Sequence, residues 1–165
     1  MKKLYFFISV FVLSVFLVGC AHTPNMSELL NYQENDWEMQ IKIKESQESF
    51  HIKAKKTADG ITLILEDENR KSVGYHMDTE GKIAMVYEEL KIPMEETPYL
   101  KCTEWFSCLN LSVGESIWRI KKERFGGIDV FVCSDGYFTV YIDCESRQPL
   151  KIQTKKTEMD IISVG

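Results

Sequence analysis

Short runs in which apolar and polar side chains alternate make up most of the chain. The first, residues 37–44, places Trp37, Met39, Ile41 and Ile43 on one side and polar or charged side chains on the other. A period of two over such short runs is typical of strands with one buried and one wet face. We therefore expect roughly nine strands, at residues 37–44, 49–56, 60–66, 73–78, 82–88, 116–125, 127–134, 137–144 and 149–156.

Turn-forming pairs separate several of these runs. Asp59-Gly60, Glu80-Gly81 and Asp135-Gly136 each suit a tight turn between antiparallel strands. Nothing long enough for a crossover helix separates the first five runs, so we expect an antiparallel meander. A two-residue turn at Asp135-Gly136 would place Cys133 opposite Phe138 and Cys144 opposite Gly127.

Two segments have a helical pattern instead. Ser27 can cap a short helix in "SELLNY". Thr97, followed by Pro98, can cap a second helix at about 97–110. This helix carries an apolar stripe at three- and four-residue spacings, formed by Cys102, Trp105, Phe106 and Leu109.

Together these elements predict a mainly β (α+β) fold. A wide sheet with one wet face must cover its apolar face or curl around it, and only two helical segments are available as a cover. We expect a single antiparallel half-barrel sheet with helices packed on the concave face, and a partly filled apolar cavity between them.

The first twenty residues predict export and a lipid anchor. Lys2 and Lys3 precede an uncharged apolar run that ends at Gly19 and is shorter than a membrane-spanning helix needs. "LVGC" resembles a bacterial lipobox, in which the cysteine receives diacylglycerol. We expect residues 1–19 to be a lipoprotein signal peptide, 20–26 a tether lipidated at Cys20, and 27–165 a single half-barrel domain on the outer side of the cell membrane.

The net charge of the chain indicates which classes of partner it can bind. The chain has a net charge of −5 and no block of basic residues, whereas nucleic acid binding needs clustered Lys and Arg. We therefore expect no nucleic acid partner.

The order of elements resembles the LolA/LolB-like family, and its Firmicutes lipoproteins in particular. The matching features are the lipobox, the short helix ending in "LLNYQ", the strand meander, the helical insertion before the last hairpins, and "DCESRQPLKI", where Pro149 leads into a late strand. The resemblance implies an open half-barrel that holds a lipid. Firmicutes relatives include lipoproteins that act through partner proteins, among them a clostridial germination lipoprotein paired with a cell-wall amidase.

Residues that could carry catalysis or bind a metal are scattered. Cys102, Cys108, Cys133 and Cys144 leave two alternatives open, disulfides between the helix and the hairpins or four reduced thiols. No pair has the spacing of a structural zinc site, and no nucleophile turn is present. His51 and His76 fall on predicted wet faces. We expect no metal, no cofactor and no enzymatic activity.

Two functions remain. The first is a module that binds a lipid or other hydrophobe beneath its helices, with a cavity lined by Met39, Ile41, Ile52, Leu63, Met77, Met85, Trp105 and Phe106. The same side chains could instead form a dry core. The second is an interaction protein that positions or activates another envelope protein, such as a cell-wall enzyme, through an exposed sheet edge.

Overall fold

The computed structural model describes residues 24–46, 48–65, 73–87, 90–94, 101–111 and 117–165. The helical elements are α2 (Met26–Leu29), the 3₁₀ turn η1 (Asn31–Gln33) and α3 (Lys101–Leu109). The strands are β1 (Trp37–Glu45), β2 (Glu48–Thr57), β3 (Gly60–Leu65), β4 (Val73–Asp78), β5 (Ile83–Tyr87), β6 (Leu90–Pro93), β7 (Arg119–Phe125), β8 (Ile128–Ser134), β9 (Thr139–Asp143), β10 (Pro149–Gln153) and β11 (Thr157–Val164).

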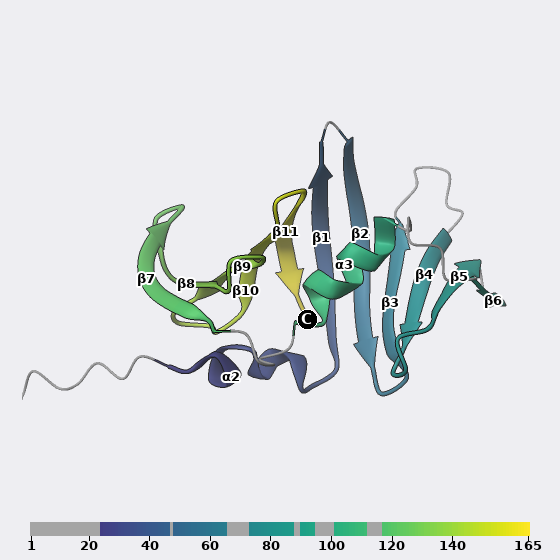
Figure 1. Ribbon diagram of the computed structural model, residues 1–165, viewed down its shortest axis with the longest axis horizontal. Helices are drawn as coiled ribbons and strands as arrows, with labels where there is room; N and C mark the ends of the chain where they lie inside the picture. The colour runs from purple at the N-terminus through teal and green to yellow at the C-terminus, as the bar shows by residue number, and fades with distance from the viewer. Residues whose placement is uncertain (1–23, 47, 66–72, 88–89, 95–100, 112–116) are drawn as a thin grey trace, which may run out of the picture.

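The described strands form one open antiparallel sheet in the order β6-β5-β4-β3-β2-β1-β11-β10-β9-β8-β7. Two meanders, β1–β6 and β7–β11, meet where the first strand pairs with the last. Figure 1 shows α3 lying across the first meander, while β7–β10 curl at the other end, above α2. The expectation of a mainly β, open antiparallel fold is confirmed.

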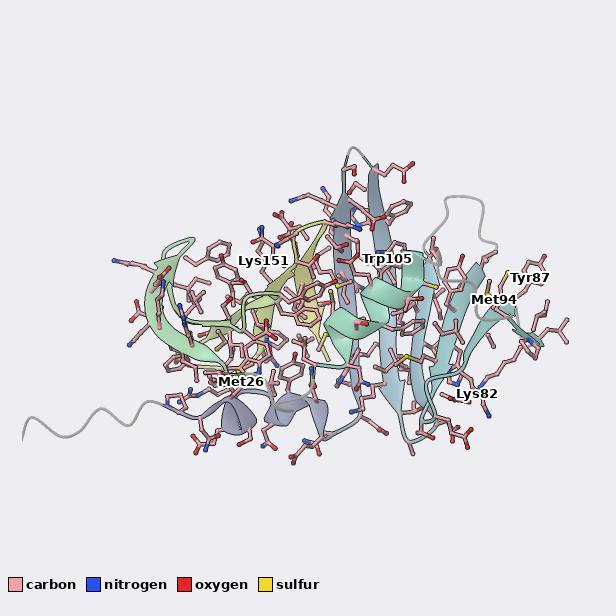
Figure 2. All side chains as sticks on the ribbon, in the orientation of Figure 1. Met26, Lys82, Tyr87, Met94, Trp105 and Lys151 are labelled. Carbon is pink, nitrogen blue, oxygen red and sulfur yellow. The ribbon has the colours of Figure 1, made fainter. Side chains whose placement is uncertain are left out.

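The alternating side chains of neighbouring strands lie in register on one face of the sheet. Ile41 pairs with Ile52, and Ile52 with Leu65, so that apolar side chains line up across strands. Buried residues of α2, α3 and both meanders belong to one core. Trp105 of α3 lies 5.4 Å from Phe50 of β2, measured between ring centroids. The apolar stripe predicted for this helix is therefore its buried side (Figure 2).

The structure has two strands more than the roughly nine expected. β6 was missed because it has only four residues and ends at Pro93, so its alternation of Leu90 and Ile92 with Lys91 is too short to stand out. β11 was missed because it follows directly after a polar turn, in which the Thr157 amide donates to Thr154 Oγ1 at 3.0 Å. β11 nevertheless pairs with β1 and joins the two meanders.

The hairpin at Asp135-Gly136 exists, but its predicted register is wrong. Ser134 pairs with Thr139, so Cys133 lies opposite Val140 and not opposite Phe138. The Asp135 carboxylate explains the longer loop, because Oδ1 accepts from the amides of Tyr137 at 2.9 Å and Phe138 at 2.7 Å. These bonds hold four residues in the turn.

The short first helix also begins differently from the expectation. Its N-cap is Asn25, whose Oδ1 accepts from the Glu28 amide at 2.9 Å. Ser27, the predicted cap, lies inside the helix and donates its hydroxyl to the same Asn25 oxygen at 2.6 Å. Met26, placed in the tether by the sequence, packs in the core. The predicted cap of the second helix, at Thr97 and Pro98, lies outside the described residues.

His76 is on the predicted face of β4 but is not wet. Only 6% of it is exposed, because β3 and β5 flank it on both sides. A hydrogen bond of 2.9 Å joins its Nδ1 to Thr62 Oγ1. Burial, together with the Lys91 charge, lowers the pKa of His76. His51, by contrast, is exposed as expected.

Candidate functional site

A pocket of about 360 Å³ lies beside the C-terminal part of α3. Its volume is within the range of small-molecule sites, at the lower end. The pocket is bounded by α3, the end of β4, the start of β7 and the β8–β9 turn, so both meanders contribute to it. Its lining residues are Met77, Phe106, Ser107, Asn110, Leu111, Trp118, Asp135, Tyr137 and Phe138.

Six of the nine lining residues are apolar or aromatic, and about half of the surface that they and their neighbours expose to the pocket is polar. Phe106 is buried and packs in the core, Trp118 and Phe138 are partly buried against it, and Tyr137 is exposed. The ring centroids of Tyr137 and Phe138 are 4.7 Å apart in an edge-to-face arrangement. Aromatic walls with a few polar groups are typical of sites for apolar ligands.

The pocket has more neutral polar side chains than charged ones. Ser107 on α3 and Asn110 just after it are exposed, and among the described lining residues Asp135 is the only ionisable one besides the Tyr137 phenol. The indole Nε1 of Trp118 is buried and has no hydrogen-bond partner among the described residues.

A second pocket of about 660 Å³ shares Met77 and Asn110 with the first. Most of its other walls are polar, formed by the β2–β3 and β4–β5 turns and by the segment before β1. Four carboxylates line it, those of Glu34, Asp36, Asp78 and Glu80, together with Lys56. The second pocket therefore adds several carboxylates to the aromatic residues that line the first.

Contacts from distant parts of the chain fix α3, and with it the first pocket. The Gln33 amide Nε2 donates to the Leu109 carbonyl at 3.3 Å, at the C-terminal end of the helix. Thr154, before β11, donates its hydroxyl to Glu104 at 2.6 Å. The helix is thereby tied both to the N-terminal segment and to the second meander.

The structure separates the predicted ligand residues into two groups. Met77 and Phe106 line the first pocket. Met39, Ile41, Ile52, Leu63 and Trp105 lie in the core, each no more than 3% exposed, and Met85 is partly buried on β5. The remaining wall, above all Trp118 and Phe138, was missed by sequence reasoning. Both belong to runs predicted as strands and lie one residue before the observed β7 and β9. The alternation marks them as apolar positions but does not show that they meet α3. Cys20 lies outside the described residues.

The four remaining cysteines are free thiols in the structure, the second of the two alternatives. Burial raises the pKa of Cys108 and of Cys133 to about 12, so both stay protonated at neutral pH. Buried, protonated thiols are poor nucleophiles. Among the described residues, no group of three or more His, Cys, Asp or Glu is placed to hold a metal ion. In the same part of the chain, no helix is long and apolar enough to cross a bilayer.

No protein-family model matches the chain, and no curated protein sequence matches it. Its structure is similar to that of an uncharacterized conserved protein from Thermus thermophilus, with a TM-score of 0.53 and 10% identity, over 84% of this chain and 85% of that chain. This likeness shows a shared fold.

Two further solved structures have lower scores. One is MucB (TM-score 0.47, 12% identity, 84% of this chain and 57% of that chain). The other is the Pseudomonas aeruginosa MucA/MucB complex (TM-score 0.44, 12% identity, 84% and 56%). The chain thus spans just over half the length of MucB.

Proposed function

We propose that this chain is a non-enzymatic, membrane-anchored envelope lipoprotein with a LolA-like half-barrel, its helices on the concave side, that binds a lipid or other hydrophobe. The observation that carries the proposal is the pocket of about 360 Å³ whose lining includes Met77, Phe106, Trp118 and Phe138. Apolar ligands gain affinity by removing such surfaces from water. The lipobox at Cys20 supports a location on the outer side of the membrane.

The pocket suits one part of an amphiphile better than a whole lipid. Its volume is small, and it continues at Met77 and Asn110 into the second, acidic pocket. An acyl or aromatic group would occupy the first pocket, against Phe106, Trp118 and Phe138. The polar end of the ligand would extend toward the carboxylates.

Photo-crosslinking tests this proposal. The purified full chain would be placed in vesicles containing a phosphatidylcholine with a diazirine in its acyl chain, irradiated, and mapped by peptide mass spectrometry. We expect adducts on the peptides that contain Phe106 or Phe138. The matched variants are Ser107→Trp, which fills the pocket from its exposed wall, and Thr103→Trp, one turn earlier on the same helix and outside the pocket.

The two variants should behave differently. Ser107→Trp should remove most of the pocket adducts, and Thr103→Trp should keep them. If the wild-type protein gives no pocket adducts, or if the two variants label equally, the binding proposal is wrong.

A second candidate function rests on β6. Within the described part of the chain this edge strand pairs with β5 alone, and its apolar Leu90 and Ile92 are 65% and 46% exposed. Figure 2 shows this edge, near Tyr87 and Met94, far from α3. Exposed edge strands accept a strand from another protein. A photoreactive amino acid at Lys91 would then crosslink an envelope protein in the host, whereas the same probe at Lys82 in the β4–β5 turn would not.

A further inference from the structure

The hairpin of β7 and β8 ends in an uncovered apolar tip. Phe125 and Ile128 pair across the two glycines of the turn, Gly126 and Gly127. The φ angles of the glycines, +58° and +90°, are the left-handed pair that a tight turn of this kind needs. A Cβ atom added at either glycine would meet no atom within 4 Å. The tip therefore projects into open space.

The two apolar side chains at this tip remain accessible to solvent. Phe125 is 39% exposed and Ile128 is 46% exposed. One side of Phe125 is supported, because its ring centroid lies 4.9 Å from that of Tyr141 and 5.9 Å from the Lys151 ammonium. The tip therefore projects from the sheet with its apolar end outward, and neither Phe125 nor Ile128 belongs to the hydrophobic core.

Positive charge surrounds the tip of an otherwise acidic chain. β7 has four basic residues, Arg119, Lys121, Lys122 and Arg124, and one acid, Glu123. All four are exposed, and the last three lie within about 13 Å of Phe125 along the strand. Their ion pairs, Lys122 with Asp129 at 3.3 Å and Lys121 with Glu123 at 3.5 Å, are on the surface. With Glu123 and Asp129 counted against the four basic residues, the two strands keep a net charge of +2.

From these features we infer that the β7–β8 tip docks on an anionic lipid surface. Phe125 and Ile128 would enter the interface, and the basic side chains of β7 would lie at the level of the headgroups. An acidic peptide would satisfy the charges but would leave the apolar turn in water, which favours the membrane as partner. Figure 1 shows the hairpin at the same end of the molecule as α2, which follows the predicted lipid anchor. The docking goes beyond the ligand proposal, because it involves no residue of either pocket.

Depth-dependent fluorescence quenching tests the inference. The full chain with Ile128→Trp would be placed in vesicles of brominated-acyl phosphatidylcholine, with and without phosphatidylglycerol. The emission of the wild-type protein would be subtracted. The matched control is Ile162→Trp, an exposed isoleucine on β11. We expect strong quenching of the Ile128→Trp probe that rises with the phosphatidylglycerol content, and weak quenching of the Ile162→Trp probe at every composition.

Charge variants measure the electrostatic part. In the Ile128→Trp background, Lys121→Gln together with Arg124→Gln should lower the ratio of docked to undocked hairpin by about 30-fold. Lys42→Gln together with Lys55→Gln, on β1 and β2, should leave the ratio unchanged. Circular dichroism checks that each variant is folded.

Three results would overturn the inference. The first is that the Ile128→Trp probe is quenched no more strongly than the Ile162→Trp probe. The second is that the Ile128→Trp probe is quenched equally in vesicles with and without phosphatidylglycerol. The third is that the two pairs of charge substitutions change the ratio of docked to undocked hairpin equally. Vesicle flotation of the same samples reports the lipid anchor separately. A chain that floats with an unquenched tip contradicts the docking alone, and a failure of pocket crosslinking leaves the docking result unaffected.

Discussion

Truncating Trp105 to alanine should show how strongly α3 is held on the sheet. Trp105 is 3% exposed, and its ring packs on Phe50 of β2. Removing a buried aromatic side chain costs about 3–5 kcal/mol, and the aromatic pair contributes about 0.5–1.5 kcal/mol of that beyond burial. We expect Trp105→Ala to lower the free energy of unfolding by about 4 kcal/mol, and the melting temperature by roughly 10–15 °C.

Urea and thermal unfolding followed by circular dichroism would measure this, since Trp105→Ala also changes fluorescence. The control is Thr103→Ala, an exposed position on the same helix that should change stability by about 0.5 kcal/mol or less. A double-mutant cycle with Phe50→Ala should give a coupling of about 1 kcal/mol. A loss below about 1 kcal/mol for Trp105→Ala, or no coupling to Phe50, would refute the packing of α3 against β2.

Three further changes have definite expected outcomes. Gly60→Ala should lower the free energy of unfolding, measured by urea titration, by about 2 kcal/mol or more. The φ of Gly60 is +133°, and the new Cβ would lie 2.0 Å from a carbonyl oxygen of β4. The control, Gly81→Ala, would meet no atom within 4 Å and should cost less. Cys108 and Cys133 have pKa values raised by burial from 9.0 to about 12, so the native state keeps protons that the unfolded state releases. The free energy of unfolding should therefore be undiminished below about pH 9 and fall between about pH 9 and 12, and a flat profile from pH 8 to 11 would contradict the burial of these thiols. Cys20→Ser should abolish metabolic labelling with palmitate and release the protein from the membrane fraction, and retained label would show that the lipobox interpretation is wrong.

The first three strands of the first meander could be predicted because buried side chains alternate along them. On β1, for example, Met39, Ile41 and Ile43 are buried and lie at every second position. The pattern of each of these strands therefore shows which of its faces packs in the core. The pairing of β1 with β11 has no local signal in the sequence, because it joins residues more than a hundred positions apart. It depends on where the second meander places β11. Local periodicity predicts strands, but it does not determine their order in the sheet.

The candidate site was predicted only in part, for a related reason. Met77 and Phe106 belong to periodic runs and were in the predicted lining. Trp118 and Phe138 also belong to alternating runs, but the pocket forms only where the β8–β9 turn approaches α3, a contact between distant segments that local periodicity does not show. The four-residue turn that positions Phe138 is set by the Asp135 carboxylate, a local bond that a hairpin rule based on Asp-Gly alone does not anticipate.

The most direct test of the binding proposal is native mass spectrometry of the full-length protein purified from its own host. The proposal predicts a second, noncovalent mass beyond that of the lipidated chain, corresponding to a bound lipid or other hydrophobe. That mass should be absent in the Ser107→Trp variant and present in Thr103→Trp. A wild-type spectrum with only the lipidated chain, under conditions that preserve noncovalent lipid complexes, would contradict the proposal.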